Sequence, residues 1–441
     1  MSKEENRKNF SKYVSQNILG MIGFSCYVLA DSYFISIAKG ADGLTALNLV
    51  MPLYSIIFSI GEMIGVGSAI RYAISKIKKD ADADDYFWNA LIWCILSSML
   101  FVFAGIFFSA DIMRVLGADE HIVAVGNNYT KIFMCFAPMF MCNYVTNAFV
   151  RNDGAPGIAM SATLFSSLFN IVFDYILMFP MNLGMEGAAL ATALSPIIGM
   201  GICSIHFFSK KSSVRLVVCK PSVRKLVAGS QLGVSAFVGE MSSAVITLAF
   251  NFVILKLAGN VGVAAYGVVA NIAIVTTAVF NGVAQGSQPL ISSCFGRGDK
   301  DGCTQLKRMG YTTAFVLAAV MYSILFIFAG QFVAVFNSEG SEMLRLYATE
   351  GVKLYFIGIF FAGINIVGGG AFSATEDAFK AAVVSVARGF VLILGAVFVM
   401  SALFGMTGVW SSFPATELIT AVVCVVFLIL KNNRMRKHNN I

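Results

Sequence analysis

Charged residues are scarce in this sequence. Asp, Glu, Lys and Arg make up 12% of the 441 residues, whereas hydrophobic residues make up 58%. Soluble globular proteins carry about 25% charged residues, so this composition excludes an ordinary soluble protein. Apolar runs of about 20 residues, each long enough to cross a bilayer, recur along the whole chain and leave no room for a large soluble domain. The composition therefore predicts a polytopic membrane protein and gives no support to nucleic-acid binding.

The chain also lacks the usual patterns of metal and nucleotide sites. The three histidines lie near loops or a terminus, and the nine cysteines are scattered without paired spacing. We interpret the cysteines as small apolar packing residues rather than disulfides or metal ligands. No phosphate-binding loop is present, so direct drive by ATP is not expected. Without a convergent nucleophile and base or a signalling domain, a membrane enzyme or a receptor is a remote alternative, and we expect no cofactor.

Hydropathy divides the chain into twelve predicted spans. An even number of spans places both termini on one side of the membrane. The spans lie at about 13–38, 47–70, 87–109, 129–149, 158–179, 187–208, 230–257, 263–290, 311–335, 349–372, 380–403 and 409–430.

Basic residues indicate which side holds the termini. Of the 31 Lys and Arg residues, 24 fall on the terminal side of the predicted spans, including Arg151 and the tail residues from Lys431 onward. Positive residues are retained in the cytoplasm. We therefore predict a multi-pass protein of the cell (inner) membrane with both termini in the cytoplasm.

The two halves of the chain resemble one another. GLTALNLVMP at Gly43 matches GVAAYGVVAN at Gly262, and further matches recur at the same offset of 219 residues. We predict a parallel repeat of two pseudo-symmetric six-helix bundles with a substrate cavity between them. The predicted division is a first lobe at 1–210, a cytoplasmic linker at 211–229, and a second lobe with a short basic tail at 230–441.

Four polar residues stand out in the first half: Asp31, Asn170, Asp174 and Thr192. Asn170 and Asp174 are one turn apart on one face of an otherwise lipid-like helix. Helical rise places all four roughly 7 to 14 Å below the outer surface, so they can share one pocket. Two carboxylates in one pocket repel unless a cation or a proton lies between them, which predicts either an oxygen-ligand site for Na⁺ or a proton-binding pair. The alternative is a neutral hydrogen-bonded cluster that packs three helices.

The second half does not repeat this chemistry. Alignment of the halves sets Arg388 against Asn170 and Leu392 against Asp174. Polar residues in the membrane are functional candidates by default. Glu240 is a candidate counter-charge for a cationic substrate; the alternatives are a structural partner of Arg388 or a hydrogen bond that packs helices. The full set of substrate-cavity candidates is Glu62, Glu240, Gln288, Arg388 and Glu417.

Over nearly its full length the chain resembles the multidrug and toxic compound extrusion (MATE) family of the MOP superfamily. The resemblance rests on several segments together. They are LADSYFISIAKGADGLTALNLVMPL (29–53), FNIVFDYILMF (169–179), GMEGAALATALS (184–195), GVAAYGVVANI (262–272), GVAQGSQPLISSCFGRGD (282–299) and GVWSSFPATE (408–417).

This resemblance implies a V-shaped pair of six-helix lobes and export of drugs by alternating access, driven by inward flow of Na⁺ or H⁺. The family's cation cluster looks like Asp31, Asn170, Asp174 and Thr192, and its acidic residue in the seventh span looks like Glu240, whereas a second acidic site in the tenth span has no match here. We expect a monomer in membrane lipid that exports amphipathic, often cationic drugs, without choosing between Na⁺ and H⁺. The alternative within transport is a flippase for lipid-linked precursors or polysaccharides, which would need several basic residues in its cavity.

Overall fold

The structure is a computed structural model that describes residues 3–336 and 340–439, and these residues contain helices but no β-strand. The predicted all-α membrane architecture is thereby confirmed. The elements are α1 (Lys3–Lys78), α2 (Asp85–Val115), α3 (Glu120–Cys135), α4 (Ala137–Asn152), α5 (Pro156–Met178), α6 (Gly184–Phe207), α7 (Val223–Gly296), α8 (Lys300–Ile327), α9 (Ala329–Phe336), α10 (Glu342–Tyr355), the 3₁₀ turn η1 (Phe356–Gly358), α11 (Ile359–Ser373), α12 (Ala378–Val386), the π-helix η2 (Ala387–Val391) and α13 (Leu392–Asn439).

Three of the long helices turn back on themselves at a glycine. Gly40 in α1, Gly259 in α7 and Gly405 in α13 each have a φ near +60°, a conformation that glycine adopts without steric cost. The rings of Phe250 and Tyr266 stack at 5.0 Å although they are 16 residues apart, a separation of about 24 Å along a straight helix. The chain at Gly259 has therefore reversed, and α7 holds two antiparallel passes.

The number of passes agrees with the twelve predicted spans. Within the described residues, nine helical segments are long and apolar enough to cross a membrane, or ten if α3 and α4, bent by 46°, count as one. Two of the ten, Val223–Gly296 and Ala378–Ile429, are double passes, which makes twelve. At the start of the second half, α7 begins at Val223 rather than at residue 230, because Ser222 accepts a hydrogen bond from the Lys225 backbone and caps the helix inside the predicted linker.

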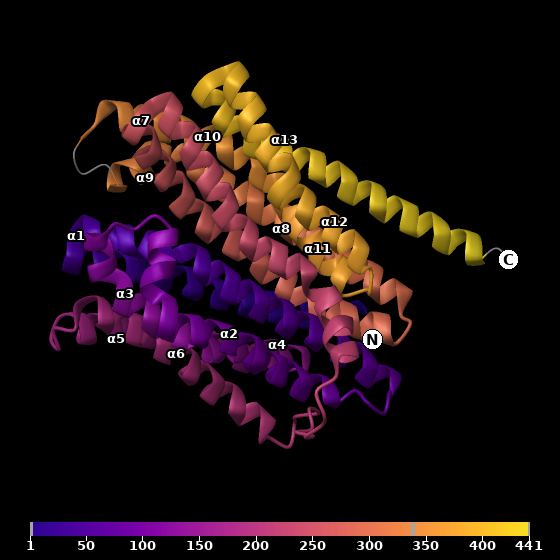
Figure 1. The fold of residues 1–441 in the computed structure, drawn as a ribbon. Helices are drawn as coiled ribbons and strands as arrows, with labels where there is room; N and C mark the ends of the chain where they lie inside the picture. Colours follow the sequence, from indigo (N-terminus) through magenta and orange to yellow (C-terminus); the bar gives the residue numbers. More distant parts are fainter. Residues whose placement is uncertain (1–2, 337–339, 440–441) are drawn as a thin grey trace.

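The passes gather into two groups, each around its own apolar core. Helices α1 to α6, coloured indigo to magenta, pack on one side of the molecule, and the orange to yellow helices of the second half pack on the other (Figure 1). One large cluster of buried residues runs from Ile35 to Leu232, and the other lies mainly between Phe250 and Phe413. We call these groups the first lobe (α1 to α6) and the second lobe (α7 to α13).

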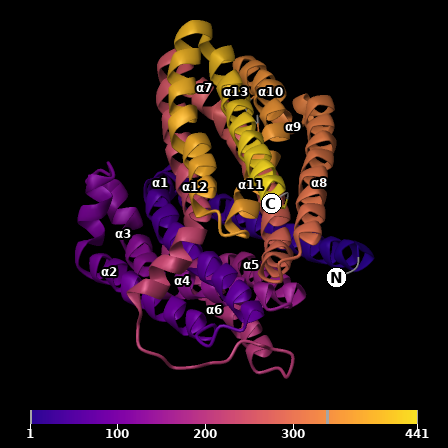
Figure 2. The same ribbon diagram turned by 90° about the vertical axis from the view of Figure 1, so that its right-hand side faces the viewer.

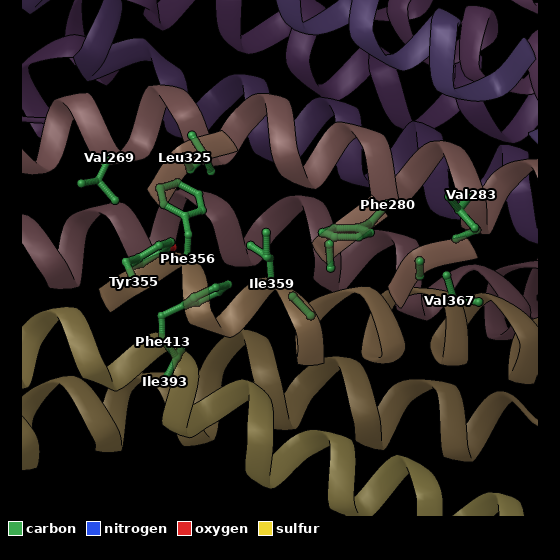
Figure 3. Packing of buried hydrophobic residues seen from close by; sticks show 14 of the residues in the cluster. Val269, Phe280, Val283, Leu325, Tyr355, Phe356, Ile359, Val367, Ile393 and Phe413 are labelled. Carbon is green, nitrogen blue, oxygen red and sulfur yellow. The ribbon is translucent and has the colours of Figure 1, made fainter. Parts of the chain in front are cut away.

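Aromatic side chains fill much of the second core. Tyr355 and Phe413 stack with ring centroids 4.2 Å apart, and Phe356 and Ile359 pack around them (Figure 3). Both termini lie at one end of the molecule, which we call the terminal end (Figures 1 and 2).

The lobes meet through two crossings at which backbone lies on backbone. At the first, a Cβ atom on Gly67 or Gly233 would overlap the main chain of the other lobe. At the second, a Cβ on Gly286 would lie 2.8 Å from Val14 Cα, and one on Gly282 would lie 2.6 Å from Ile18 Cα. Gly67 and Gly286 are 219 residues apart, as are Val14 and Gly233, so the two crossings are equivalent under the sequence repeat.

A side chain at the first crossing is expected to push the lobes apart. Gly233→Val places a branched side chain against the Met63 backbone, which cannot yield as a flexible side chain would. Spin labels placed on α2 and α8 should report a longer distance between the lobes. Gly239→Val, on the same pass but with no atom within 4 Å of the added Cβ, is the matched control. Equal distances in the two variants would show that the crossing does not set the spacing of the lobes.

Candidate functional site

The structure brings the four polar residues of the first lobe together. Asp31 comes from the first pass of α1, Asn170 and Asp174 from α5, and Thr192 from α6; each is at most 5% exposed. With its amide nitrogen toward the carboxylate, Asn170 donates a hydrogen bond to Asp174 Oδ2 over 3.1 Å and accepts one from Thr192 Oγ1 over 3.2 Å. This orientation gives both ends of the amide a suitable partner.

Two carboxylate oxygens in this cluster have no partner. Oδ1 of Asp31 and Oδ1 of Asp174 are buried without a hydrogen bond, and the two carboxylates are close enough to interact electrostatically. Buried like charges with free oxygens are unstable unless a proton or a cation compensates them. The geometry suits a small cation held by oxygen atoms, although the binding itself stays a prediction. Within the described residues, no three His, Cys, Asp or Glu side chains gather as metal ligands.

Tyrosines that the sequence reasoning did not single out surround this pair. Tyr27 and Tyr54 both interact electrostatically with Asp31 and Asp174, and the Tyr54 hydroxyl hydrogen-bonds with that of Tyr129. Each of these tyrosines places a polar hydroxyl within an apolar predicted span, and this feature of the sequence could have identified them as candidates.

A cavity of about 120 Å³ lies beneath this cluster, and most of its wall belongs to the first lobe. Glu62 of α1 and Glu240 of α7, two of the substrate-cavity candidates, both line it. All but three of the lining residues come from α1 to α6; the three are Glu240, Asn281 and Gln285. The cavity therefore lies inside the first lobe and is closed on one side by the second.

Arg151 lies at this cavity, which the sequence did not predict. Counted among the basic residues of a cytoplasmic loop, it is instead 5% exposed, because α4 continues to Asn152 and directs the side chain inward. Its Nη1 donates to Gln285 Oε1 over 2.7 Å and to Asn17 Oδ1 over 3.4 Å. Gln285 Nε2 donates in turn to Glu62 Oε1 over 3.1 Å, so a chain of hydrogen bonds joins the lobes.

Arg388 and Glu417 form an ion pair inside the second lobe instead of lining the cavity. Arg388 Nη2 lies 2.7 Å from Glu417 Oε1, and Asn365 Nδ2 donates to Glu417 Oε2 over 2.6 Å. Glu417 is 1% exposed and both of its carboxylate oxygens are occupied, so it is not available to a substrate in this conformation. One alternative made Glu240 the partner of Arg388, but that partner is Glu417. Gln288, 6% exposed and with an unpartnered Oε1, lies next to Gly370 and is not among the lining residues.

Comparisons with known proteins agree with this architecture. The MatE family matches the chain at residues 17–176 and 236–399. The multidrug export protein MepA of Staphylococcus saprophyticus is 26% identical over 425 residues, and MepA of Staphylococcus aureus is 27% identical over 430 residues; both alignments cover 95% of this chain and 92% of the relative. A solved structure described as the outward-facing conformation of a multidrug resistance MATE family transporter of the MOP superfamily superposes with a TM-score of 0.88, covering 98% of this chain and 97% of the other. At 20% sequence identity, that last likeness concerns the fold alone.

Proposed function

Because the chain belongs to the MatE family of membrane transporters, we propose that it is an antiporter that exports amphipathic, often cationic organic compounds in exchange for Na⁺ or H⁺. The observation that carries the coupling is the pair of unpartnered, buried oxygens on Asp31 and Asp174. The MepA relatives, named as multidrug export proteins, support export of several drugs rather than one metabolite.

The coupling follows from the charge at this pair. Without a bound cation the carboxylates of Asp31 and Asp174 repel each other. A bound cation attracts both, so cation binding stabilises the arrangement of α1, α5 and α6 that brings the carboxylate oxygens closest together. A ligand shifts a conformational equilibrium only by its differential affinity for the two states. A cation that enters from outside would thereby favour the state that releases the drug outward.

The cavity supplies a site for a positively charged compound. Glu62 and Glu240 face it together with Arg151, so with all three ionised the cavity carries one net negative charge. Drug-sized ligands occupy pockets of about 300 to 1,000 Å³, which exceeds the present volume. We infer that a drug binds in a state in which the lobes are further apart. The flippase alternative would need several basic residues, and Arg151 is the single Lys or Arg among the lining residues.

Orientation follows from the basic residues. We place both termini in the cytoplasm of a cell whose inner membrane the protein spans as a monomer. The terminal end, where the lobes cross, is then the closed cytoplasmic side.

The proposal is tested in proteoliposomes loaded with a fluorescent organic cation. An inward Na⁺ gradient and an inward proton gradient are imposed separately, and dye release is followed. We expect one gradient to accelerate release in the native protein and to have no effect in Asp31→Asn. If neither gradient accelerates release from vesicles that bind the dye, the protein is not a cation-coupled exporter.

A further inference from the structure

A stripe of polar side chains leads from the candidate cation site into the cavity. On α5, Thr163, Ser167, Asn170 and Asp174 follow at intervals of four, three and four residues, so they lie on one helix face over about 16 Å. Thr163 and Ser167 line the cavity, and their hydroxyls donate to backbone carbonyls of their own helix over 3.2 and 2.8 Å. Thr163 Oγ1 also accepts a hydrogen bond from Asn147 Nδ2 over 3.1 Å. A hydroxyl oxygen has two lone pairs, so both side chains still offer an acceptor to a passing cation.

The cavity connects this stripe with the terminal end. Asn143, Asn147 and Arg151 line it at intervals of four residues along α4, and Asn17 of α1 lies beside Arg151. Asn143 Oδ1 is buried without a partner, and the volume holds several water molecules but no drug. Tyr27, one turn from Asp31 on α1, lines the cavity between the two regions.

The terminal end of this polar passage is occupied by a fixed positive charge. The Arg151 guanidinium is held by Gln285, a residue of the second lobe, and its Nε has no hydrogen-bond partner. The carboxylates facing the cavity, Glu62 and Glu240, do not bind Arg151 directly: Glu62 reaches it through Gln285. A fixed arginine in a narrow polar pore is a barrier to cations, because a desolvated ion cannot pass close to it without strong repulsion.

Resting on the proposed function, we propose that Arg151, held by Gln285, is a charge gate that closes an internal exit for the coupling cation. While the lobes touch at the terminal end, Gln285 keeps the guanidinium across the passage, and a cation bound by Asp31 and Asp174 cannot leave inward. When the lobes separate there, Gln285 moves away with the second lobe and leaves Arg151 only its 3.4 Å hydrogen bond to Asn17. The cation then leaves through the cavity of the first lobe. Arg151 thus prevents the coupling cation from crossing the membrane when no drug is transported.

The test is a leak measured without drug. Proteoliposomes receive an inward proton gradient or an inward Na⁺ gradient, and a pH-sensitive or Na⁺-sensitive dye inside reports its decay. We expect Arg151→Gln to dissipate the gradient of the coupling ion at least about tenfold faster than the native protein, as when a barrier falls by about 1.4 kcal/mol. Gln285→Leu removes the hydrogen-bond acceptor that holds the Arg151 guanidinium, so this variant should also leak. Arg151→Lys keeps a positive charge at the same position and should not leak.

A control separates the gate from a general loosening of the lobes. Arg71 forms an ion pair with Glu376 across the lobes, away from the passage, so Arg71→Gln weakens the lobe contact but leaves Arg151 in place. We expect no leak from this variant. An equal leak from Arg71→Gln, or a tight Arg151→Gln that is folded and binds dye, would overturn the proposal.

A double variant identifies the origin of the leak. If the passage begins at the carboxylate pair, adding Asp174→Asn to Arg151→Gln should suppress the leak. Persistence of the leak would place its route elsewhere and overturn the proposed passage. The proposed antiport fails on a different result, namely coupled dye release that survives in Asp174→Asn alone, so the two failures are distinguishable.

Discussion

Asp174→Asn is expected to weaken cation-driven release of an organic cation strongly while leaving binding of the organic cation intact. Asparagine keeps the shape of the side chain and its contact with Asn170, but it removes one of the two buried charges, so the site should hold the coupling cation far more weakly. Coupling free energies between two sites are typically 1 to 3 kcal/mol, and we therefore expect the acceleration of release by the gradient to fall by about 5- to 150-fold. Dye release from proteoliposomes under the imposed gradient measures this effect.

The matched control is Asp111→Asn. Asp111 lies in the last turns of α2, 63% of its side chain is exposed, and it pairs with Arg114 on the surface. The same chemical change there should leave cation-driven release at the native rate, because exposed ion pairs contribute little. Native rates in Asp174→Asn, or equal losses in the two variants, would show that the Asp31 and Asp174 pair is not the coupling site.

Arg388→Met is expected to destabilise the second lobe strongly. Removal of the guanidinium leaves Glu417, 1% exposed, as an uncompensated charge, and breaking a buried ion pair in this way typically costs about 3 to 5 kcal/mol. The double variant Arg388→Met with Glu417→Gln removes both charges, keeps the amide contact with Asn365, and should recover most of the lost stability. Thermal unfolding of the detergent-solubilised protein measures both.

The same pair of variants also tests where coupling lies. If the cation acts only in the first lobe, the folded double variant should retain gradient-driven dye release. Loss of coupling in a double variant of native stability would instead assign the Arg388 and Glu417 pair a part in transport. A single variant as stable as the native protein would show that Glu417 is compensated by some other group.

The proximity of the four polar residues in the first lobe was predictable because its signal is local. Asn170 and Asp174 are one turn apart in an apolar run, and helical rise was sufficient to place Asp31 and Thr192 at the same depth. The twelve spans were predictable for a similar reason, since apolar length alone identifies a membrane helix.

The contacts of the long basic side chains were not predictable in this way. Charge counting treats Arg151 as a loop residue, and only the helix continuing to Asn152 shows that it is directed inward. The partner of Arg388 is 29 residues away on another pass, and the choice between Glu240 and Glu417 depends on how the second lobe packs. The repeat did show that Arg388 occupies the place of Asn170, but not that its charge is balanced within its own lobe.

The glycine crossings between the lobes affect how quickly the molecule can change state. At Gly67 and Gly286 the nearest atoms of the other lobe are main-chain atoms. Without side chains on these two glycines, one lobe can slide over the other with few changes of rotamer at these points. The activation barrier to separation of the lobes would then arise mainly from the polar bonds across them, such as the ion pair of Arg71 with Glu376.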